Sequence, residues 1–258
     1  QPEQPEQPTS PQEPEPSSPE PIVGTSGDDE LQGSSENDTI TSSGGTDTIA
    51  GGGGNDIFNV NGGSATISDL QTGDSLVATN GATATANNVS DFVATSVTRN
   101  VGSTAILKST AGGSTVDMRL ATVANETSDG FVLDGSAGVD RLFGSSANDT
   151  ITGGGGADEL KGGAGDDTFL YANAAELLAS GALVDSTVSG GDGTDRISVA
   201  NGLNVVATDS WGDASSVEEL YVTGTASSNI VLGTTAETAG IETINISSST
   251  TDGNVVDV

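Results

Sequence analysis

The sequence predicts an all-β protein in which short strands stack as flattened parallel coils, behind a disordered proline-rich N-terminus. Three observations lead to this prediction. A nine-residue motif recurs in register, a longer motif of about 25 residues recurs near the C-terminal end, and no segment has a convincing helical period. Repeats at a fixed spacing without helices are typical of solenoids, in which each coil packs only on its neighbours.

The composition limits the function before any motif is considered. The 258 residues include 37 acidic and 6 basic side chains, so the net charge is −31, and only 3% are aromatic. Such values are typical of disordered chains, or of acidic proteins whose charge is neutralised by bound cations. They argue against nucleic-acid binding and against attachment to anionic lipid. No apolar run approaches the roughly 18–20 residues of a membrane span, so no membrane insertion is expected.

Cysteine and histidine are both absent. Disulfides, thiolate metal sites, histidine-based triads and histidine–zinc chemistry are therefore excluded. The remaining metal ligands are oxygen atoms, which favour calcium or magnesium over transition metals. Paired carboxylates could form a glycosidase site, but the repeat accounts for most of the clustered aspartates. With no nucleophile–base pair and no zinc motif, the chain is predicted not to be an enzyme.

All eight prolines lie within residues 1–21, where they are mixed with Gln, Glu and Ser. This composition predicts an extended, mostly polyproline-II segment without a fixed fold. We interpret it as a semi-rigid spacer from an upstream domain, with a ligand for a proline-binding partner as the alternative.

Composition and repeats divide the chain into four segments. In chain order these are the proline-rich linker 1–21, the first repeat block with a β-rich segment after it at 22–134, the second block with an extension and an isolated repeat at 135–198, and β-solenoid-like repeats at 199–258.

A nonapeptide with the pattern GGxGxDxUx, where U is large and apolar, gives the strongest signal. Four copies run through residues 24–59, four through 135–170, and one stands alone at 190–198. The eighth position is always large and apolar: Leu31, Ile40, Ile49, Phe58, Leu142, Ile151, Leu160, Phe169 and Ile197. The sixth position is always aspartate: Asp29, Asp38, Asp47, Asp56, Asp140, Asp149, Asp158, Asp167 and Asp195.

The repeat has a simple physical interpretation. Its last three positions form a short strand with one inward apolar residue, and its first six form a turn for which glycine supplies positive φ angles. Two repeats make a flattened coil of 18 residues, and coils stack at the strand spacing of about 4.8 Å. Because phenylalanine ends both four-repeat blocks, we expect Phe58 and Phe169 to seal the ends of the thin core.

Stacking places each aspartate near the aspartate two repeats later. Carboxylates this close repel each other unless a cation lies between them, and carboxylate and carbonyl oxygens at about 2.3–2.6 Å suit calcium better than magnesium. Complete sites are expected from the pairs 29/47, 38/56, 140/158 and 149/167, whereas Asp195 lacks an adjacent repeat. Glu36, Ser42 and Ser43 depart from the pattern and could weaken the sites of the first block.

These repeats resemble the RTX (repeats-in-toxin) family over residues 24–59 and 135–170, with 190–198 as an outlier. The segment NGGSATISDLQTGDSLV after the first block also looks like the segment that often follows RTX blocks. The resemblance implies a parallel β-roll, several calcium ions in the turns, and export by type I secretion, usually in bacteria. It also implies that backbone carbonyls at positions 2 and 4 complete the sites, at Gly27, Gly45, Gly52, Gly54, Gly138, Gly154, Gly156, Gly163 and Gly165.

Outside the repeats, alternating runs at 95–101, 103–109 and 114–123 predict short strands. The best helix candidate is 172–183, with Gly181 as its stop.

Further along, Asn204, Asn229 and Asn254 are spaced by 25, and Ile197, Leu220 and Ile244 by 23 and 24, which predicts stacked coils with two strands each. We expect Trp211 to lie in the core rather than to stack on a sugar. Asp69 and Asp74 could bind a further calcium ion or lie in a solvated turn.

The predicted function is a calcium-dependent structural module of an extracellular or cell-surface protein, such as an adhesin or a surface-layer component, which folds on calcium binding after export. Its expected partners are calcium and, through self-association or otherwise, surface components. One alternative is a non-catalytic RTX module of a type I-secreted enzyme such as a protease, lipase or polysaccharide-modifying enzyme. Another is carbohydrate or ice binding by the solenoid face, although threonine is irregularly spaced in the sequence.

Overall fold

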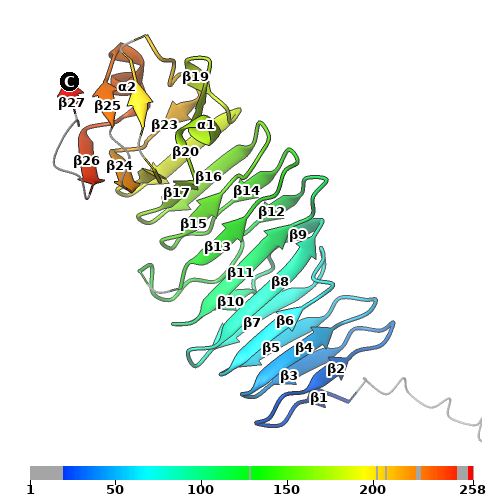
Figure 1. Ribbon diagram of the computed structural model, residues 1–258. Helices are drawn as coiled ribbons and strands as arrows, with labels where there is room; N and C mark the ends of the chain where they lie inside the picture. The colour runs from blue at the N-terminus through cyan, green and yellow to red at the C-terminus, as the bar shows by residue number, and fades with distance from the viewer. Residues whose placement is uncertain are drawn as a thin grey trace, which may run out of the picture.

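The computed structural model of the protein describes residues 20–127, 129–201, 203–206, 208–224, 228–248 and 255–257. The linker expected at 1–21 lies outside the described residues except for its last two. The described chain winds as a β-solenoid of stacked coils, from the blue N-terminal end to the red C-terminal end (Figure 1). Nearly all of it is strand and turn, as the sequence predicts.

One long parallel sheet runs the length of the solenoid. Its strands in order are β2 (Glu30–Gln32), β4 (Thr46–Ala50), β6 (Ser64–Ile67), β8 (Thr83–Val89), β11 (Thr104–Ser109), β13 (Phe131–Asp134), β15 (Thr150–Thr152), β17 (Thr168–Tyr171), β21 (Arg196–Val199), β24 (Glu219–Gly224) and β26 (Thr243–Ser248). Both repeat blocks contribute to it, so the blocks share one continuous stack.

Three shorter parallel sheets form the remaining faces. The N-terminal sheet contains β1 (Ile22–Val23), β3 (Thr39–Ser42), β5 (Ile57–Asn61), β7 (Ser75–Thr79) and β10 (Arg99–Asn100). The middle sheet contains β9 (Asp91–Val93), β12 (Thr115–Asp117), β14 (Arg141–Phe143), β16 (Glu159–Ala164), β20 (Thr187–Asp192) and β23 (Ala214–Ser215). The C-terminal sheet contains β22 (Asn204–Val205), β25 (Asn229–Val231) and β27 (Val255–Asp257).

Strand register confirms the 18-residue coil. Ile22 pairs with Ile40, Ile40 with Phe58, and in the second block Leu142 pairs with Leu160. Towards the C-terminal end the coils lengthen as the spacing predicts, because Ile197 pairs with Leu220 and Leu220 with Ile244. Asn204 pairs with Asn229, whereas Asn254 lies outside the described residues and the next strand sets Val255 opposite Asn229.

The core is a thin layer of apolar side chains between the sheets. The position-8 residues of all nine repeats are buried in it. Burying one such side chain contributes about 1.5–3 kcal/mol. Trp211 is also buried, in agreement with its expected core position.

The expectation that Phe58 and Phe169 seal the ends of the core is wrong. Phe58 pairs onward with Leu76 in β7, and Phe169 pairs onward with Ile197 in β21. Both rings therefore have a coil on either side. The stack continues because alternating apolar residues extend the core even where the glycine and aspartate pattern stops.

The helix expected at 172–183 is shorter than predicted. Helix α1 (Ala174–Leu177) is capped by the Asn173 side chain and gives way to an antiparallel hairpin of β18 (Leu178–Ala179) and β19 (Ala182–Leu183). Gly181, with φ +83°, lies in the hairpin turn and does not end a helix.

A second helix, α2 (Thr234–Ala239), was not expected and ends at Gly240. Within the described part of the chain, no helix is long and apolar enough to cross a membrane.

Candidate calcium-binding turns

The aspartates of the repeats form a ladder from coil to coil. The Asp29 amide donates to Asp47 Oδ1 at 3.0 Å and the Asp38 amide to Asp56 Oδ1 at 2.9 Å. In the second block, Asp140 donates to Asp158 Oδ1 at 2.8 Å and Asp149 to Asp167 Oδ1 at 2.7 Å. The structure therefore brings together the two aspartates of every pair expected from the sequence.

The start of the strand explains why an acid is needed at position 6. The Asp38 carbonyl begins the inter-strand ladder by accepting from the Ile57 amide at 2.9 Å. The Asp38 amide comes just before that ladder, so it needs another acceptor, and the Asp56 carboxylate provides it. An unpaired buried amide would cost about 1–3 kcal/mol.

The ladder extends beyond the repeats. Asp56 donates to Asp74 Oδ1 at 2.9 Å, Asp167 to Asp195 Oδ1 at 2.8 Å, and Asp195 to Glu218 Oε2 at 2.8 Å. Asp195, isolated in the sequence, is thus stacked like the others. Sequence reasoning missed Glu218, and it did not recognise Asp74 as part of the ladder. Both stand two residues before a buried leucine, the phase of the repeat, and this signal could have found them.

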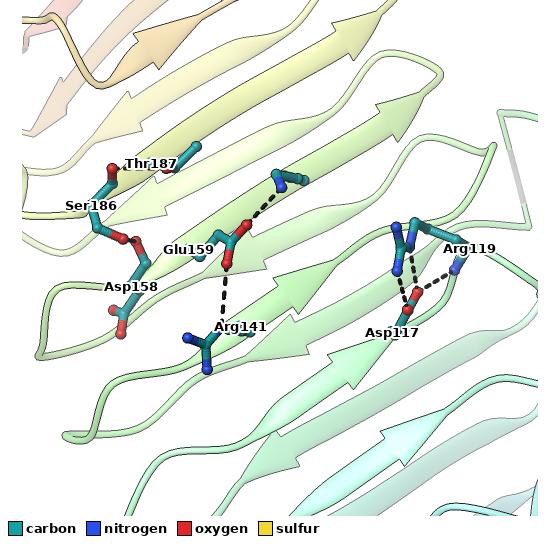
Figure 2. Close-up of polar contacts among 8 residues, drawn as sticks. Asp117, Arg119, Arg141, Asp158, Glu159, Ser186 and Thr187 are labelled. Carbon is teal, nitrogen blue, oxygen red and sulfur yellow. Dashed lines mark hydrogen bonds and ion pairs between the residues drawn. The ribbon is translucent and has the colours of Figure 1, made fainter.

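Asp185 was also missed, because it lies one residue out of phase. The Asp158 amide donates to its Oδ1 at 3.1 Å, and Tyr171 donates its hydroxyl to its Oδ2 at 2.6 Å. Asp185 stands three residues before the buried Val188, one more than in the repeat. This extra residue is accommodated where the Ser186 hydroxyl donates to the Asp158 carbonyl at 2.9 Å (Figure 2). The Ser186 and Thr187 amides donate to the same carbonyl.

The two acids left open by the sequence, Asp69 and Asp74, do not lie in a simple solvated turn. Asp69 accepts from the amides of Gly51 and Gly52 at 2.9 and 2.8 Å. Asp74 is fully buried, and its second oxygen accepts from Gln71 at 3.0 Å.

A second ladder at position 5 was not anticipated. Asn37 accepts the Asn55 amide, Asn148 accepts the Asp166 amide, and Asp166 accepts the Thr194 amide, each at 2.8 Å. These side chains tie the outer parts of stacked turns together. The preference for Asn or Asp at this position was visible in the sequence.

The donor set of the turns fits a calcium ion. Among the described residues, one buried carboxylate oxygen has no hydrogen-bond partner in Asp47, Asp56, Asp140, Asp158, Asp167 and Asp195. Leaving such an oxygen buried and unpaired is unfavourable, and hard oxygen atoms are what calcium prefers. Nowhere in the described ranges do three or more acidic side chains gather as a metal cluster, so a site here would combine carboxylates with backbone carbonyls.

The glycines bring backbone carbonyls close to the stacked turns. Gly52 and Gly54 have φ of +97° and +105°, and a Cβ added to Gly52 would lie 1.9 Å from the Ser34 carbonyl oxygen. Positive φ also holds at Gly45, Gly154, Gly156, Gly163 and Gly165. Gly27 and Gly138 lack it, but the Gly27 and Gly138 carbonyls approach Gly45 and Gly156, each at 2.3 Å from an added Cβ.

Burial and crowding perturb these carboxyl groups when no cation is present. Burial raises the pKa of Asp158 to about 7 and of Asp195 to about 6, and neighbouring carboxylates add to both shifts. Burial raises the pKa of Asp167 to about 8, with further increases from Asp149, Asp195 and Asp166 and an opposing effect of the Asp149 amide. The charged forms are therefore disfavoured in the folded, cation-free turns.

Five of the six basic residues lie on strands, and the sixth, Arg119, follows β12 in a turn. Arg119 and Lys161 line a cavity of about 210 Å³ together with glycines of two repeat turns, Gly162, Gly163, Gly190 and Gly191. Figure 2 shows Arg119 paired with Asp117, and Arg141 with Glu159, on the outer face of the middle sheet. Arg119 is also centred over the Phe143 ring at 4.9 Å. Exposed pairs like these contribute about 0–1 kcal/mol to stability.

Fold and turns together define a parallel β-roll with acidic, glycine-rich turns. Residues 23–58 and 134–169 each match the family model described as the RTX calcium-binding nonapeptide repeat (4 copies). The two blocks are RTX repeats, as their resemblance implied. RTX repeats bind several calcium ions and are typical of secreted bacterial proteins. Neither the comparison with curated proteins nor that with solved structures found a match.

Proposed function

We propose that this chain is a calcium-dependent structural module of an extracellular or cell-surface protein, of the adhesin or surface-layer type, which folds outside the cell. The supporting observation is the row of buried, unpartnered carboxylate oxygens in stacked turns. Buried acids that repel one another oppose folding in the absence of a cation. Bound calcium supplies positive charge and accepts these oxygens as ligands, so its binding free energy becomes folding free energy.

The proposed carboxylate ligands are the position-6 aspartates Asp29, Asp38, Asp47, Asp56, Asp140, Asp149, Asp158, Asp167 and Asp195. The proposed carbonyl ligands belong to the position-2 and position-4 glycines named above. Catalysis has no place in this proposal, because RTX β-rolls are structural modules. Low cytosolic calcium would keep the chain unfolded for export, and millimolar calcium outside would fold it.

The elongated stack suits a spacer or lattice element of a surface protein. A non-catalytic module of a type I-secreted enzyme would use the same calcium chemistry. The full-length gene product separates the two: a catalytic domain in the same chain favours the enzyme module, and long repeats on both sides favour the surface protein.

Far-ultraviolet circular dichroism during calcium titration of chelator-treated protein tests the proposal. We expect a largely unfolded spectrum without calcium and a cooperative rise in β structure with it. An unchanged β spectrum after chelation would refute the proposal. Electron microscopy at the same calcium concentrations then distinguishes ordered assembly from a soluble module.

The outer face of the long sheet supports a second candidate, binding of ice or carbohydrate. Threonine spacing is irregular in the sequence, yet the register aligns Thr46, Ser64, Thr83 and Thr104 in one row. A parallel row contains Thr48, Thr66 and Thr85. The alignment arises because coils of unequal length accommodate their extra residues in the turns.

These two rows form a hydroxyl array with a regular spacing. Neighbouring members of a row are about 4.8 Å apart, and the two rows are about 7 Å apart along the strands. Such an array resembles an ordered water layer more than a sugar-stacking surface. Thermal hysteresis measured on calcium-loaded protein tests this candidate: Thr66→Tyr should abolish it, and Thr39→Tyr on the opposite sheet should not. No hysteresis in the unsubstituted protein rules out ice binding.

A further inference from the structure

The repeats contain two kinds of turn, distinguished by whether the residue at position 2 donates hydrogen bonds to the Oδ2 atom of the aspartate in the same turn. In the first two turns of each block, position 2 is Ser or Thr. This residue donates at least one hydrogen bond to the Oδ2 atom of the position-6 aspartate in the same turn. In the first block, the Ser34 amide and hydroxyl donate to Asp38 Oδ2 at 2.6 and 2.9 Å. In the second, the Ser145 amide and hydroxyl donate to Asp149 Oδ2 at 2.6 and 3.0 Å. We call these closed turns.

The last turn of the first block, the last two turns of the second block and the isolated repeat have glycine at position 2. The glycine has positive φ, and in the described structure nothing donates to the Oδ2 atom of the aspartate. We call these open turns, and their aspartates are Asp56, Asp158, Asp167 and Asp195, each no more than 1% exposed. The third repeat is also open, although Ser43 occupies position 2, because its positive-φ residues are Gly44 and Gly45.

This division shows which pair of turns leaves the Oδ2 atoms of both aspartates free, although a closed turn can still keep a free Oδ1, as Asp140 does. Each pair expected from the sequence stacks a closed turn on an open one. Across the insertion that contains α1 and the β18–β19 hairpin, however, Asp167 and Asp195 stack as two open turns. The second of these turns lies outside the residues that match the family model.

The contacts between these two turns are well suited to a cation. A Cβ at Gly191 would lie 1.9 Å from the Gly163 carbonyl oxygen, and one at Gly193 would lie 2.1 Å from the Gly165 carbonyl oxygen. Carbonyls of the turn at 162–167 therefore face the turn at 190–195 directly. Beside the turns, a cavity of about 360 Å³ is lined partly by the acids Asp166, Asp192 and Glu126, which would attract a cation from solvent.

We propose that the tightest calcium site of the chain lies between turns 162–167 and 190–195, with Asp167 and Asp195 as its carboxylate ligands. The sites are ranked by whether position 2 donates to the aspartate, because in a closed turn Ser or Thr already occupies the Oδ2 atom. This inference rests on the proposed calcium binding. Occupation of the site would also join the second block to the C-terminal coils across the insertion.

Asp195→Asn tests the site, because asparagine keeps a side-chain oxygen for the Asp167 amide but removes the charge. Asp28→Asn is the matched control. Asp28 Oδ1 accepts the Thr46 amide of the next coil at 2.8 Å, so asparagine again keeps the acceptor and removes the charge, and Asp28 is not a proposed ligand. Isothermal titration of chelated protein with calcium should show one ion fewer, or at least tenfold weaker binding of one ion, for Asp195→Asn. Asp28→Asn should bind the full number of ions.

Hydrogen exchange of the unsubstituted protein gives a test that does not depend on how a variant folds. Amides of residues 162–167 and 190–195 should become protected at lower calcium than those of residues 24–29 and 33–38. The reverse order, or unchanged titration of Asp195→Asn, overturns this inference and leaves the proposed function intact. An unsubstituted chain that binds no calcium would instead refute the proposed function.

Discussion

Alanine at Gly52 should destabilise the calcium-loaded protein strongly, whereas alanine at the neighbouring Gly53 should not. Gly52 has φ +97°, a conformation that costs an L residue about 1–3 kcal/mol. An added Cβ would also lie 1.9 Å from the Ser34 carbonyl oxygen, a backbone atom of the adjacent coil that cannot move independently. Gly53 lacks positive φ, and an added Cβ there meets nothing closer than 3.6 Å.

Alanine at Gly53 should even stabilise the protein slightly, by about 0.4–1 kcal/mol, because it restricts the unfolded chain. The two variants should therefore differ by at least about 2 kcal/mol. Because folding and calcium binding are coupled, that difference corresponds to about 30-fold in the folding equilibrium at a fixed calcium concentration. Urea unfolding followed by circular dichroism at saturating calcium measures it directly. Equal stability of the two variants would refute the stacked-turn geometry.

Three further predictions concern the core, pH and the choice of cation. Phe58→Ala should lower the free energy of unfolding by about 3–5 kcal/mol, whereas Leu120→Ala, at an exposed position, should lower it by less than about 0.5 kcal/mol. Urea unfolding measures both, and similar losses for the two variants would contradict the core assignment. Because burial raises the pKa of Asp158 to about 7 and of Asp167 to about 8, calcium-free protein should be most stable near or below the ordinary aspartate pKa of 3.8 and lose stability as pH rises to about 8. More β structure at pH 8 than at pH 5, measured by circular dichroism in chelator, would be the contrary result. Magnesium at ten times the calcium concentration should not restore the β spectrum, because a cage of carbonyl oxygens suits its small octahedral shell poorly; full recovery with magnesium would show that the site is not selective.

Local periodicity made much of the fold predictable. The apolar residue at position 8 and the acid two residues before it are set by the pleat of a short strand and by the turn that precedes it. Their phase therefore appears directly in the sequence, and residues such as Ile40 and Leu160 occupy the core positions expected of them. The C-terminal spacing of Ile197, Leu220 and Ile244 was predictable for the same reason.

Other features depend on which coil lies above which, and no short window of sequence contains that information. Phe58 looked like an end of the core because the glycine pattern stops after it, but β7 adds another coil. Asp195 looked isolated because the insertion separates it in sequence from Asp167, on which it stacks. Loop length has little effect on which strands pair, since extra residues can be accommodated outside the ladder.

The sequence by itself determined that this protein is an all-β stack of acidic, glycine-rich turns suited to calcium, because residue type and phase decide which atoms face the turn and which face the core. Only the tertiary structure decided which carboxylate oxygens remain available to a cation. That outcome depends on hydrogen bonds from the coil below and from the residue at position 2. Ser34 closes the turn of Asp38 while Gly52 leaves that of Asp56 open, a distinction that exists only once the coils are stacked.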